Sequence, residues 1–163
     1  MAPGEEGEIL SRGPKQFLGY RDASLDDAAF LGSWFRTGDL GRFDDDGHLV
    51  ITDRVKDIII RGGENISAQE VEEELMGLEG VAEVAVVAQP DDRLGERAAA
   101  IVRMVQDHEA PTLDQVREHL GAVGLAKQKW PEAIYAVPDF PRTPSGKIQK
   151  YVVRQKLREG ELG

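Results

Sequence analysis

The chain has 163 residues, of which 40% are hydrophobic and 31% charged, with a formal net charge of −10 at pH 7 and no cysteine. The lack of cysteine excludes disulfides, thiolate chemistry and cysteine metal sites, and the excess of acidic residues argues against nucleic acid as the main partner. No apolar run approaches the ~20 residues that cross a bilayer, and the acidic, glycine-rich stretch 1–8 is unlike a signal peptide, so we expect no transmembrane segment and a cytoplasmic location.

The N-terminal third is predicted to be short-stranded and rich in turns. Residues 8–12 and 16–20 are predicted strands on either side of a Gly-Pro pair. Residues 24–31 are a predicted short helix, capped by Ser24 or Asp22.

A β-hairpin is predicted around Asp44-Asp45-Asp46-Gly47, between the strand-like stretches 41–43 and 48–51. Three aspartates in a row also raise the question of calcium. They lack the alternate-ligand spacing and the distal glutamate of an EF-hand, so we interpret the run as a turn and predict no metal site.

Beyond Asp53 the apolar pattern becomes longer and more regular. The capping box Ser67-Ala68-Gln69-Glu70 predicts the start of a helix. The other predicted elements are strands at 57–61, 81–88, 97–105 and 133–137 and helices that begin after Thr112 and at Ile148. This order predicts the α+β class: a small C-terminal domain, 54–163, with a three-stranded sheet, a β-hairpin and flanking helices, preceded by a short β-rich segment, 1–53.

Lys147 is the first candidate for chemistry, because it stands at the tip of the loop Pro141-Arg142-Thr143-Pro144-Ser145-Gly146-Lys147-Ile148. Two prolines fix φ, and Gly146 relaxes the steric limits beside the lysine. Such a loop places a mobile cation within reach of a charged substrate. Taken alone, a lysine there is more often simply solvated. The segment is not a P-loop, since it lacks the upstream glycine and the following Ser or Thr.

Two further segments carry groups suited to a nucleotide. Asp39 follows a Thr-Gly turn, and a fixed carboxylate there can accept hydrogen bonds from both hydroxyls of a ribose. Arg54 offers a guanidinium to ribose or phosphate, and Gly62-Gly63 lets the backbone pass close to a ligand. Asp39 and the two glycines, taken singly, are also explained as ordinary turn residues.

Basic residues gather toward the C-terminus: residues 127–158 carry 8 Lys and Arg against 2 Asp and Glu. This stretch is suited to small anions such as phosphates. The alternative is that Lys150, Arg154 and Arg158, at i, i+4 and i+8, form one solvated helix face, and we interpret them so. His48, His108 and His119 lack ligand spacing and are interpreted as surface or structural residues.

The order of the motifs identifies the chain. In sequence come Gly7-Glu8-Ile9, Gly19-Tyr20, Trp34-Phe35-Arg36-Thr37-Gly38-Asp39-Leu40, Asp53-Arg54-Val55-Lys56-Asp57, Gly62-Gly63-Glu64-Asn65-Ile66 and the Pro141–Ile148 loop. This set resembles the C-terminal part of the adenylate-forming superfamily: acyl-CoA synthetases, luciferase-like enzymes and the adenylation domains of peptide synthetases. The resemblance runs from about Gly4 to Arg158, and its last two segments look most like bacterial fatty-acid or medium-chain acid–CoA ligases.

The resemblance implies an ATP-dependent reaction in two steps. A carboxylate attacks the α-phosphate of ATP, giving acyl-adenylate and pyrophosphate; after the small domain rotates, the thiol of coenzyme A displaces AMP. The matching motifs assign Lys147 to the carboxylate and phosphate oxygens during adenylation. Asp39 would bind the ribose hydroxyls, and Arg54 the ribose or the adenylate. Lys56 would be the hinge position, and Gly62-Gly63-Glu64 would line the path of the pantetheine arm.

The resemblance also implies that much of the active site lies outside these residues. The family's phosphate loop, adenine pocket, magnesium-binding glutamate and acid-binding cavity are not found in the sequence. We therefore interpret 1–53 as the last strands of the large AMP-binding domain and 54–163 as the mobile C-terminal domain. ATP with Mg²⁺, a carboxylic acid and coenzyme A would be ligands of the parent ligase. The fragment alone is expected to be inactive, and its unpaired N-terminal strands leave room for an oligomer interface.

Two alternatives stay open. In the first, the chain is a stand-alone, non-catalytic module that binds an adenylate or a partner protein. In the second, it is part of a peptide-synthetase adenylation domain. The reading frame upstream of Met1 separates a truncated ligase from the stand-alone module.

Overall fold

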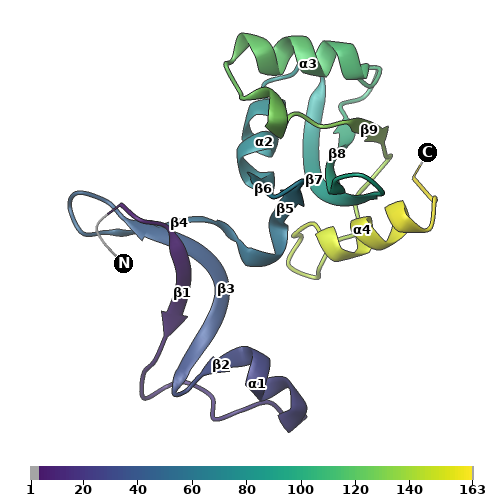
Figure 1. The fold of residues 1–163 in the computed structure, drawn as a ribbon. Helices are drawn as coiled ribbons and strands as arrows, with labels where there is room; N and C mark the ends of the chain where they lie inside the picture. Colours follow the sequence, from purple (N-terminus) through teal and green to yellow (C-terminus); the bar gives the residue numbers. More distant parts are fainter. Residues whose placement is uncertain (1–3, 163) are drawn as a thin grey trace. The chain divides into compact units, whose positions relative to one another are not determined.

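The computed structural model describes residues 4–162, the side chain of Asp53 excepted. The chain divides into two compact units, Met1–Lys56 and Asp57–Gly163, here called unit 1 and unit 2 (Figure 1). The division falls inside a short 3-10 helix, Val55–Asp57, a few residues beyond the boundary expected from the sequence.

Unit 1 is built on one long strand that pairs antiparallel with three others. Its elements are β1 (Gly7–Ser11), a 3-10 turn (Ala23–Leu25), α1 (Asp26–Ala29), β2 (Phe30–Leu31), β3 (Trp34–Phe43) and β4 (Leu49–Arg54). β3 is the common partner of β1, β2 and β4. The register shifts between Leu40 and Gly41, and such bulges bend a strand, as the curved ribbon of β3 in Figure 1 shows.

The predicted strand at 16–20 is wrong, because this segment is irregular. Its Phe17 ring instead packs against the rings of Tyr20, Phe30 and Phe35, with centroids 5.0–5.4 Å away. An edge-to-face or tilted ring cluster gains its stability from ring contacts rather than from a ladder of backbone hydrogen bonds. The predicted turn at 44–47 is confirmed, since Asp44 accepts the backbone N–H groups of Asp46 and His48.

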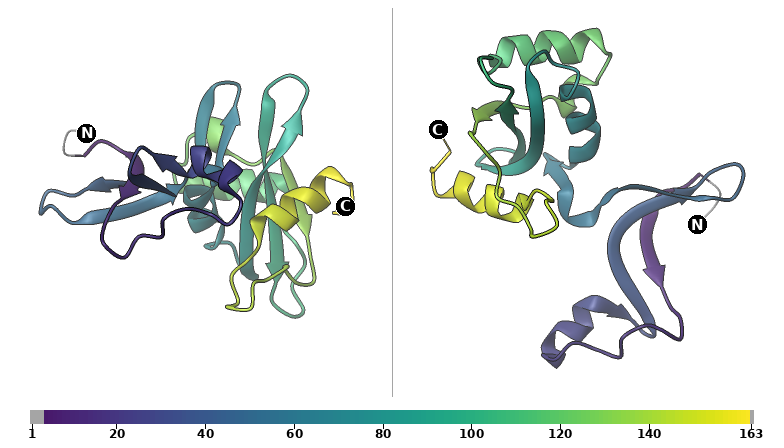
Figure 2. Two further views of the ribbon diagram at one scale, coloured as in Figure 1. Left: turned by 90° about the horizontal axis from the view of Figure 1, so that it is seen from below. Right: turned by 180° about the vertical axis from the view of Figure 1, so that it is seen from behind.

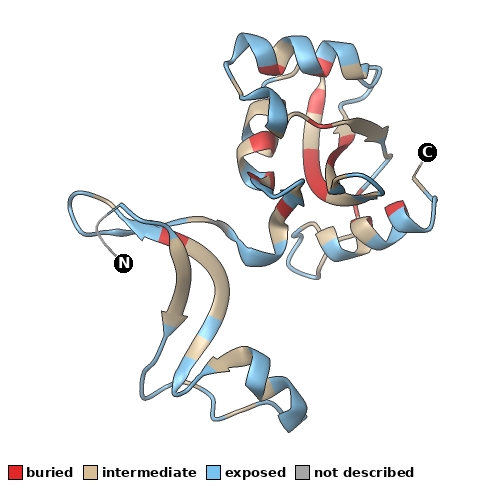
Figure 3. Ribbon diagram, viewed as in Figure 1, coloured by how far each residue is buried: buried red, intermediate tan, exposed pale blue. Residues whose placement is uncertain are grey.

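Unit 1 buries little of its surface. Among its residues whose exposure the structure describes, only Gly41 is fully buried (Figure 3). A Cβ at this position would lie 2.8 Å from the Val50 carbonyl oxygen and 2.9 Å from Ile9 Cδ1, so only glycine fits between β1 and β4. Large apolar side chains such as Leu18 and Leu31 remain exposed. A surface of this kind is typical of a face that another part of a protein covers.

Unit 2 is a five-stranded sheet flanked by helices. Its elements are β5 (Ile58–Arg61), β6 (Glu64–Ser67), α2 (Ala68–Leu75), β7 (Val81–Asp91), β8 (Gly95–Met104), α3 (Leu113–Ala122), a 3-10 turn (Lys127–Lys129), β9 (Ala133–Ala136) and α4 (Lys150–Arg158). The strand order is β6-β5-β8-β7, and β9 runs parallel to β8. The three predicted strands 81–88, 97–105 and 133–137 form its centre, and the β5–β6 hairpin joins through the pair Arg61↔Gly95. The predicted α+β class is confirmed.

Both faces of this sheet are covered, which explains why β7 and β8 read as nearly continuous apolar runs. Alternate residues such as Val84 and Val86 point to the core under α2 and α3, and Ala85 and Val87 to the core under α4. Figure 2 shows the same arrangement, with α4 on one side of β7 and the other two helices on the opposite side. Within the described residues, no helix is long and apolar enough to span a bilayer.

The predicted starts of α2 and α3 are confirmed, whereas α4 begins at Lys150 rather than at Ile148, and the predicted helix 24–31 is helical only as far as Ala29. Ser67 accepts the backbone N–H of Glu70 at the start of α2, and Thr112 and Gln115 form a full capping box on α3. The carboxylate of Glu70 accepts two hydrogen bonds from Lys129, at 2.6 and 2.7 Å, and so connects α2 to the segment before β9.

Candidate functional site

Asp39 and Arg54 are neighbours in unit 1 because the antiparallel register of β3 and β4 places their Cα atoms opposite each other. Arg54 Nε donates to Asp39 Oδ1 over 2.8 Å. The carboxylate is 31% exposed, so it is accessible and yet held in one direction. The structure thus brings together the two residues to which the sequence assigned ribose and phosphate binding.

The backbone before Asp39 fixes its direction further. Gly38 has φ +75°, a conformation that favours glycine. The Thr37 hydroxyl donates to the Ile9 carbonyl oxygen over 2.8 Å and accepts the Asp39 N–H over 3.1 Å. The Thr-Gly turn is therefore joined to β1, and the carboxylate projects from a rigid strand rather than from a loop.

Gly62 and Gly63 form the two-residue tip of the β5–β6 hairpin, since Arg61 and Glu64 pair across it. Both glycines have positive φ, +57° and +91°, as a type I′ turn requires. The Gly62 N–H donates to the Leu94 carbonyl oxygen over 2.8 Å, which connects this tip to the β7–β8 turn. Glu64 is exposed beside the tip.

Lys147 lies at the exposed tip of the loop that precedes α4. The loop closes on itself: Thr143 N–H donates to the Lys147 carbonyl oxygen (2.9 Å), and Lys147 N–H donates to the Thr143 hydroxyl (3.1 Å). Gly146, with φ +87°, lets the chain reverse beside the lysine. Among residues 4–162, no ion pair with the Lys147 ammonium is described. The cation is thus presented to solvent on an ordered turn.

The interpretation of Lys150, Arg154 and Arg158 as one solvated helix face is wrong for the first two. Lys150 Nζ lies 2.7 Å from Glu72 Oε1 and 3.8 Å from Asp57 Oδ2, and Arg154 Nη1 lies 3.0 Å from Asp57 Oδ1. Both basic side chains are only 19% exposed. Arg158 alone of the three is exposed. The packing of α4 over the sheet turns the other two toward carboxylates.

Glu72, only 17% exposed, belongs to a group of four charged side chains, here called the Asp57 cluster (Asp57, Glu72, Lys150 and Arg154). Its Oε1 also accepts the Val86 backbone N–H over 2.6 Å. Burial raises the pKa of Glu72, while the charge and hydrogen bond of Lys150 oppose the rise. The cluster ties the first residue of unit 2 to α2, β7 and α4.

The sequence-predicted residues fall in both units. Asp39, Arg54 and Lys56 belong to unit 1, whereas Gly62-Gly63-Glu64 and Lys147 belong to two separate loops of unit 2. Lys56 is the last residue of unit 1 and lies in the 3-10 turn at which the chain divides. No group of three or more His, Asp or Glu residues among the described part of the chain is arranged to hold a metal ion.

The histidines have local structural roles. His119 Nε2 lies 2.8 Å from the Glu74 carbonyl oxygen and joins α3 to α2. His48 lies beside Asp44 in the turn, and His108 contacts the Gln106 carbonyl oxygen.

Sequence reasoning missed Asp57 and Glu83 as the carboxylate partners of the basic C-terminal segment. The sequence analysis named Asp57 only as the last residue of a motif, although a carboxylate directly after the expected hinge position, Lys56, is a usable signal. Arg142, adjacent to Pro141 in the Lys147 loop, pairs with Glu83, which lies 59 positions earlier in the chain. No local pattern marks that partner.

Comparison with known proteins shows what this chain is similar to. Residues 70–147 match the model of the family described as AMP-binding enzyme C-terminal domain. The chain is 44% identical over 159 residues to a medium-chain fatty-acid–CoA ligase of Escherichia coli strain K12. The aligned region covers 96% of this chain and 28% of that protein. It is 38% identical over 161 residues to a 2,3-dihydroxybenzoate–AMP ligase of Bacillus subtilis, covering 98% and 30%.

A solved structure gives the same result for the fold. The crystal structure of ATP-bound MatB from Rhodopseudomonas palustris superimposes with a TM-score of 0.88 at 34% identity, covering 98% of this chain and 32% of that one. The chain thus spans less than a third of the length of the relatives it matches here. Through its AMP-binding enzyme C-terminal domain, the chain belongs to the superfamily of adenylate-forming enzymes.

Proposed function

We propose that this chain supplies the mobile, catalytic-lysine part of an ATP-dependent acid–CoA ligase, with 1–53 as the last strands of its AMP-binding domain and 54–163 as its C-terminal domain. One observation carries the proposal most: Lys147 is presented to solvent on a closed turn, while Lys150, three residues on, is committed to ion pairs. An ammonium presented in this way can reach an anionic substrate, whereas that of Lys150 is held by carboxylates of its own chain.

In this proposal Lys147 acts during adenylation. Attack of a carboxylate on the α-phosphate of ATP builds negative charge on the phosphate oxygens as pyrophosphate leaves. A preorganised ammonium stabilises that charge more in the transition state than in the ground state. The lysine then withdraws by a rotation about Lys56, and the Gly62-Gly63-Glu64 tip takes its place to line the approach of the coenzyme A thiol.

Asp39 and Arg54 would hold the nucleotide through both steps. The Asp39 carboxylate accepts hydrogen bonds from the two ribose hydroxyls, and Arg54 keeps it oriented while its positive charge faces the adenylate. ATP is bound as its magnesium complex in such enzymes, and the metal neutralises phosphate charge. The resemblance to the family places its magnesium-binding glutamate outside these residues, so we assign no magnesium ligand to this chain.

The ribose assignment predicts a loss of sugar discrimination. In the complete ligase, Asp39→Asn is expected to lower kcat/KM for ATP by about 10- to 100-fold, because a charged acceptor for two hydroxyls is worth a few kcal/mol. The effect on 2′-deoxy-ATP should be smaller, so the preference for ATP over 2′-deoxy-ATP narrows. Asp45→Asn, in the exposed β3–β4 turn, is the matched control. An unchanged preference in Asp39→Asn would contradict the assignment.

Pyrophosphate exchange by the complete ligase against a panel of carboxylic acids tests the reaction class, and added coenzyme A tests the second step. Release of AMP with a thioester of coenzyme A supports the acid–CoA ligase. Exchange without any thioester favours an acid–AMP ligase or a peptide-synthetase adenylation domain, as the relatives that are named AMP ligases illustrate. No exchange with any acid would contradict the ligase, and the reading frame upstream of Met1 decides separately whether the chain is a stand-alone, non-catalytic module. Three expectations remain predictions: the chain expressed by itself is inactive, the protein is cytoplasmic, and unit 1 carries an oligomer interface.

A further inference from the structure

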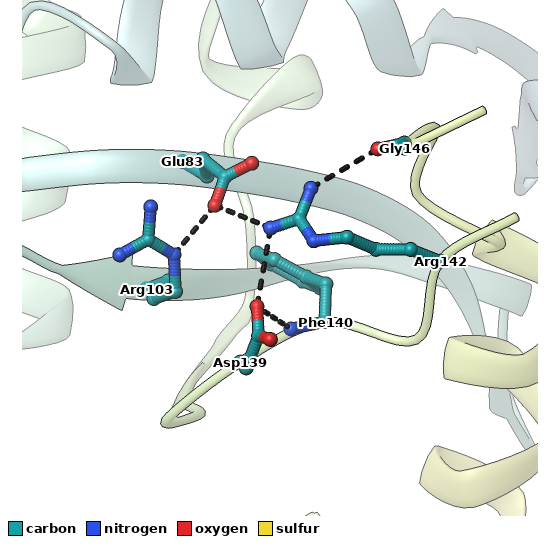
Figure 4. A network of polar contacts seen from close by, with 6 residues as sticks. All are labelled: Glu83, Arg103, Asp139, Phe140, Arg142 and Gly146. Carbon is teal, nitrogen blue, oxygen red and sulfur yellow. Dashed lines mark hydrogen bonds and ion pairs between the residues drawn. The ribbon is translucent and has the colours of Figure 1, made fainter. Parts of the chain in front are cut away.

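Arg142 connects the Lys147 loop to two other parts of unit 2. Its Nη1 donates to the Gly146 carbonyl oxygen over 3.2 Å. Its Nη2 donates to Glu83 Oε2 over 2.7 Å and to Asp139 Oδ1 over 3.1 Å. Figure 4 shows this guanidinium between the loop on one side and the two carboxylates on the other. One planar group thus joins the tip of the loop to β7.

The acceptors of Arg142 are themselves fixed. Glu83 Oε2 also accepts from Nε of Arg103, which pairs with Glu83 across β7 and β8. Asp139 Oδ1 also accepts the backbone N–H of Phe140 over 2.8 Å. The hydrogen bond from Arg142 is the foremost reason that the pKa of Glu83 lies below its ordinary value, so this carboxyl is ionised at neutral pH. Arg142 therefore binds a rigid, charged partner.

The other contacts of the loop hold its base rather than its tip. The base is closed by the bridge Arg142↔Ile148 and by the Gln149 N–H, which donates to the Pro141 carbonyl oxygen over 2.8 Å. The Ile148 side chain packs on the core under α4. At the tip, the hydrogen bonds run between Thr143, Ser145, Gly146 and Lys147 themselves. Such bonds define the shape of the turn without connecting it to the sheet.

The carbonyl group that Arg142 holds belongs to the peptide bond that immediately precedes Lys147. A peptide group is planar, so fixing its oxygen fixes the direction in which the chain enters Lys147. Gly146 on the other side of this group has φ +87° and little steric restraint of its own. Without the guanidinium, the peptide plane next to the catalytic lysine would be restrained only by the turn.

We propose that Arg142 is a positioning residue for Lys147: by joining the Gly146 carbonyl oxygen to Glu83 on β7, it gives the ammonium a fixed direction of approach. The part of this inference that concerns catalysis rests on the proposed function of Lys147. A lysine at position 142 would keep the positive charge, but its compact ammonium lacks the two separate nitrogens, Nη1 and Nη2, with which the planar guanidinium spans the Gly146 carbonyl oxygen and the Glu83 carboxylate.

The first test uses the 163-residue chain itself and needs no activity. The ¹H–¹⁵N heteronuclear NOE of Gly146 and Lys147 reports picosecond-to-nanosecond order of the turn. In Arg142→Lys we expect it to fall for these two residues and to stay unchanged along β7 and β8. Arg117→Lys, which alters an exposed pair with Asp114 on α3, is the matched control. Unchanged values at Gly146 and Lys147 would show that Arg142 does not hold the tip, and the proposal fails.

The second test uses the complete ligase. Arg142→Lys is expected to lower kcat of adenylation by about 10-fold or more, because a small misplacement of a catalytic group has effects of that size. KM for ATP and the rate of thioester formation from supplied acyl-adenylate should change little, which a general loss of stability would not produce. A loosened turn with full adenylation activity overturns the positioning role. Lys147→Ala, measured in parallel, separates the proposed function of Lys147 from the positioning role of Arg142. If Lys147→Ala adenylates normally, the proposed function is wrong. Whether Arg142 orders the turn is then decided by the NMR result alone.

Discussion

Lys147→Ala in the complete ligase is expected to lower the rate of acyl-adenylate formation by about 10²–10³-fold, the usual effect of removing one preorganised donor to developing charge. Thioester formation from supplied acyl-adenylate should be largely spared, because in the proposed mechanism the lysine withdraws from the nucleotide before that step. Single-turnover measurement of each half-reaction checks both statements.

The folded state should not change with this substitution, since Lys147 is exposed and its turn is held by backbone and Thr143 contacts. Lys156→Ala, at an exposed position of α4, is the matched control and should affect neither half-reaction. Equal loss of both half-reactions in Lys147→Ala would contradict the role in adenylation and point to a general defect.

Lys150→Met is expected to have the opposite profile, a large loss of stability. It leaves Glu72 enclosed without its cation, and the cost of a charge left unpaired in this way is about 2–3 kcal/mol in the free energy of unfolding. Urea denaturation of the 163-residue chain, followed by circular dichroism of the helices of unit 2, measures it. Adding Glu72→Gln should recover a large part of the loss, since the amide oxygen can still accept the Val86 N–H while the charge is gone.

The loss in Lys150→Met should also depend on pH. A carboxyl whose pKa is raised by folding contributes most to stability below its unfolded pKa, and that contribution is lost as the pH rises through the folded pKa. Burial raises the pKa of Glu72, and without Lys150 the rise is larger. The difference between Lys150→Met and the unaltered chain should therefore be smaller at pH 4 than at pH 7. A difference that grows toward pH 4 would show that the Glu72 carboxylate is not the group left unpaired.

These two lysines show what the sequence could and could not predict. The loop with Lys147 at its tip follows from proline and glycine in fixed local positions, and it was predicted; the hydrogen bonds with Thr143 that close it were not. Lys150 and Arg154 are held away from solvent partly by the carboxylate of Asp57, which lies 97 positions before Arg154 in the chain. Helical spacing identified a shared face correctly, but spacing within one helix contains no information about which carboxylates the fold places against that face.

The same division holds for the fold. β7 and β8 were predictable because their side chains alternate between two buried cores, so nearly every position is apolar. The segment 16–20 contains a similar share of apolar residues, yet Phe17 and Tyr20 use their rings in a local aromatic cluster. Asp39 and Arg54 lie opposite each other because of the β3–β4 register, which includes a bulge. No residue pattern in the sequence predicted that bulge.

The reactivity of Lys147 toward an amine-selective acylating reagent tests the central claim most directly, with mass spectrometry to locate the label. In the 163-residue chain, Lys147 should be labelled readily and Lys150 hardly at all. In the complete ligase, ATP together with the acid found by pyrophosphate exchange, in the absence of coenzyme A, should protect Lys147 by at least about 10-fold, because its ammonium then contacts the nucleotide. Labelling of Lys147 that is the same with and without these substrates would show that the ammonium never reaches the adenylate.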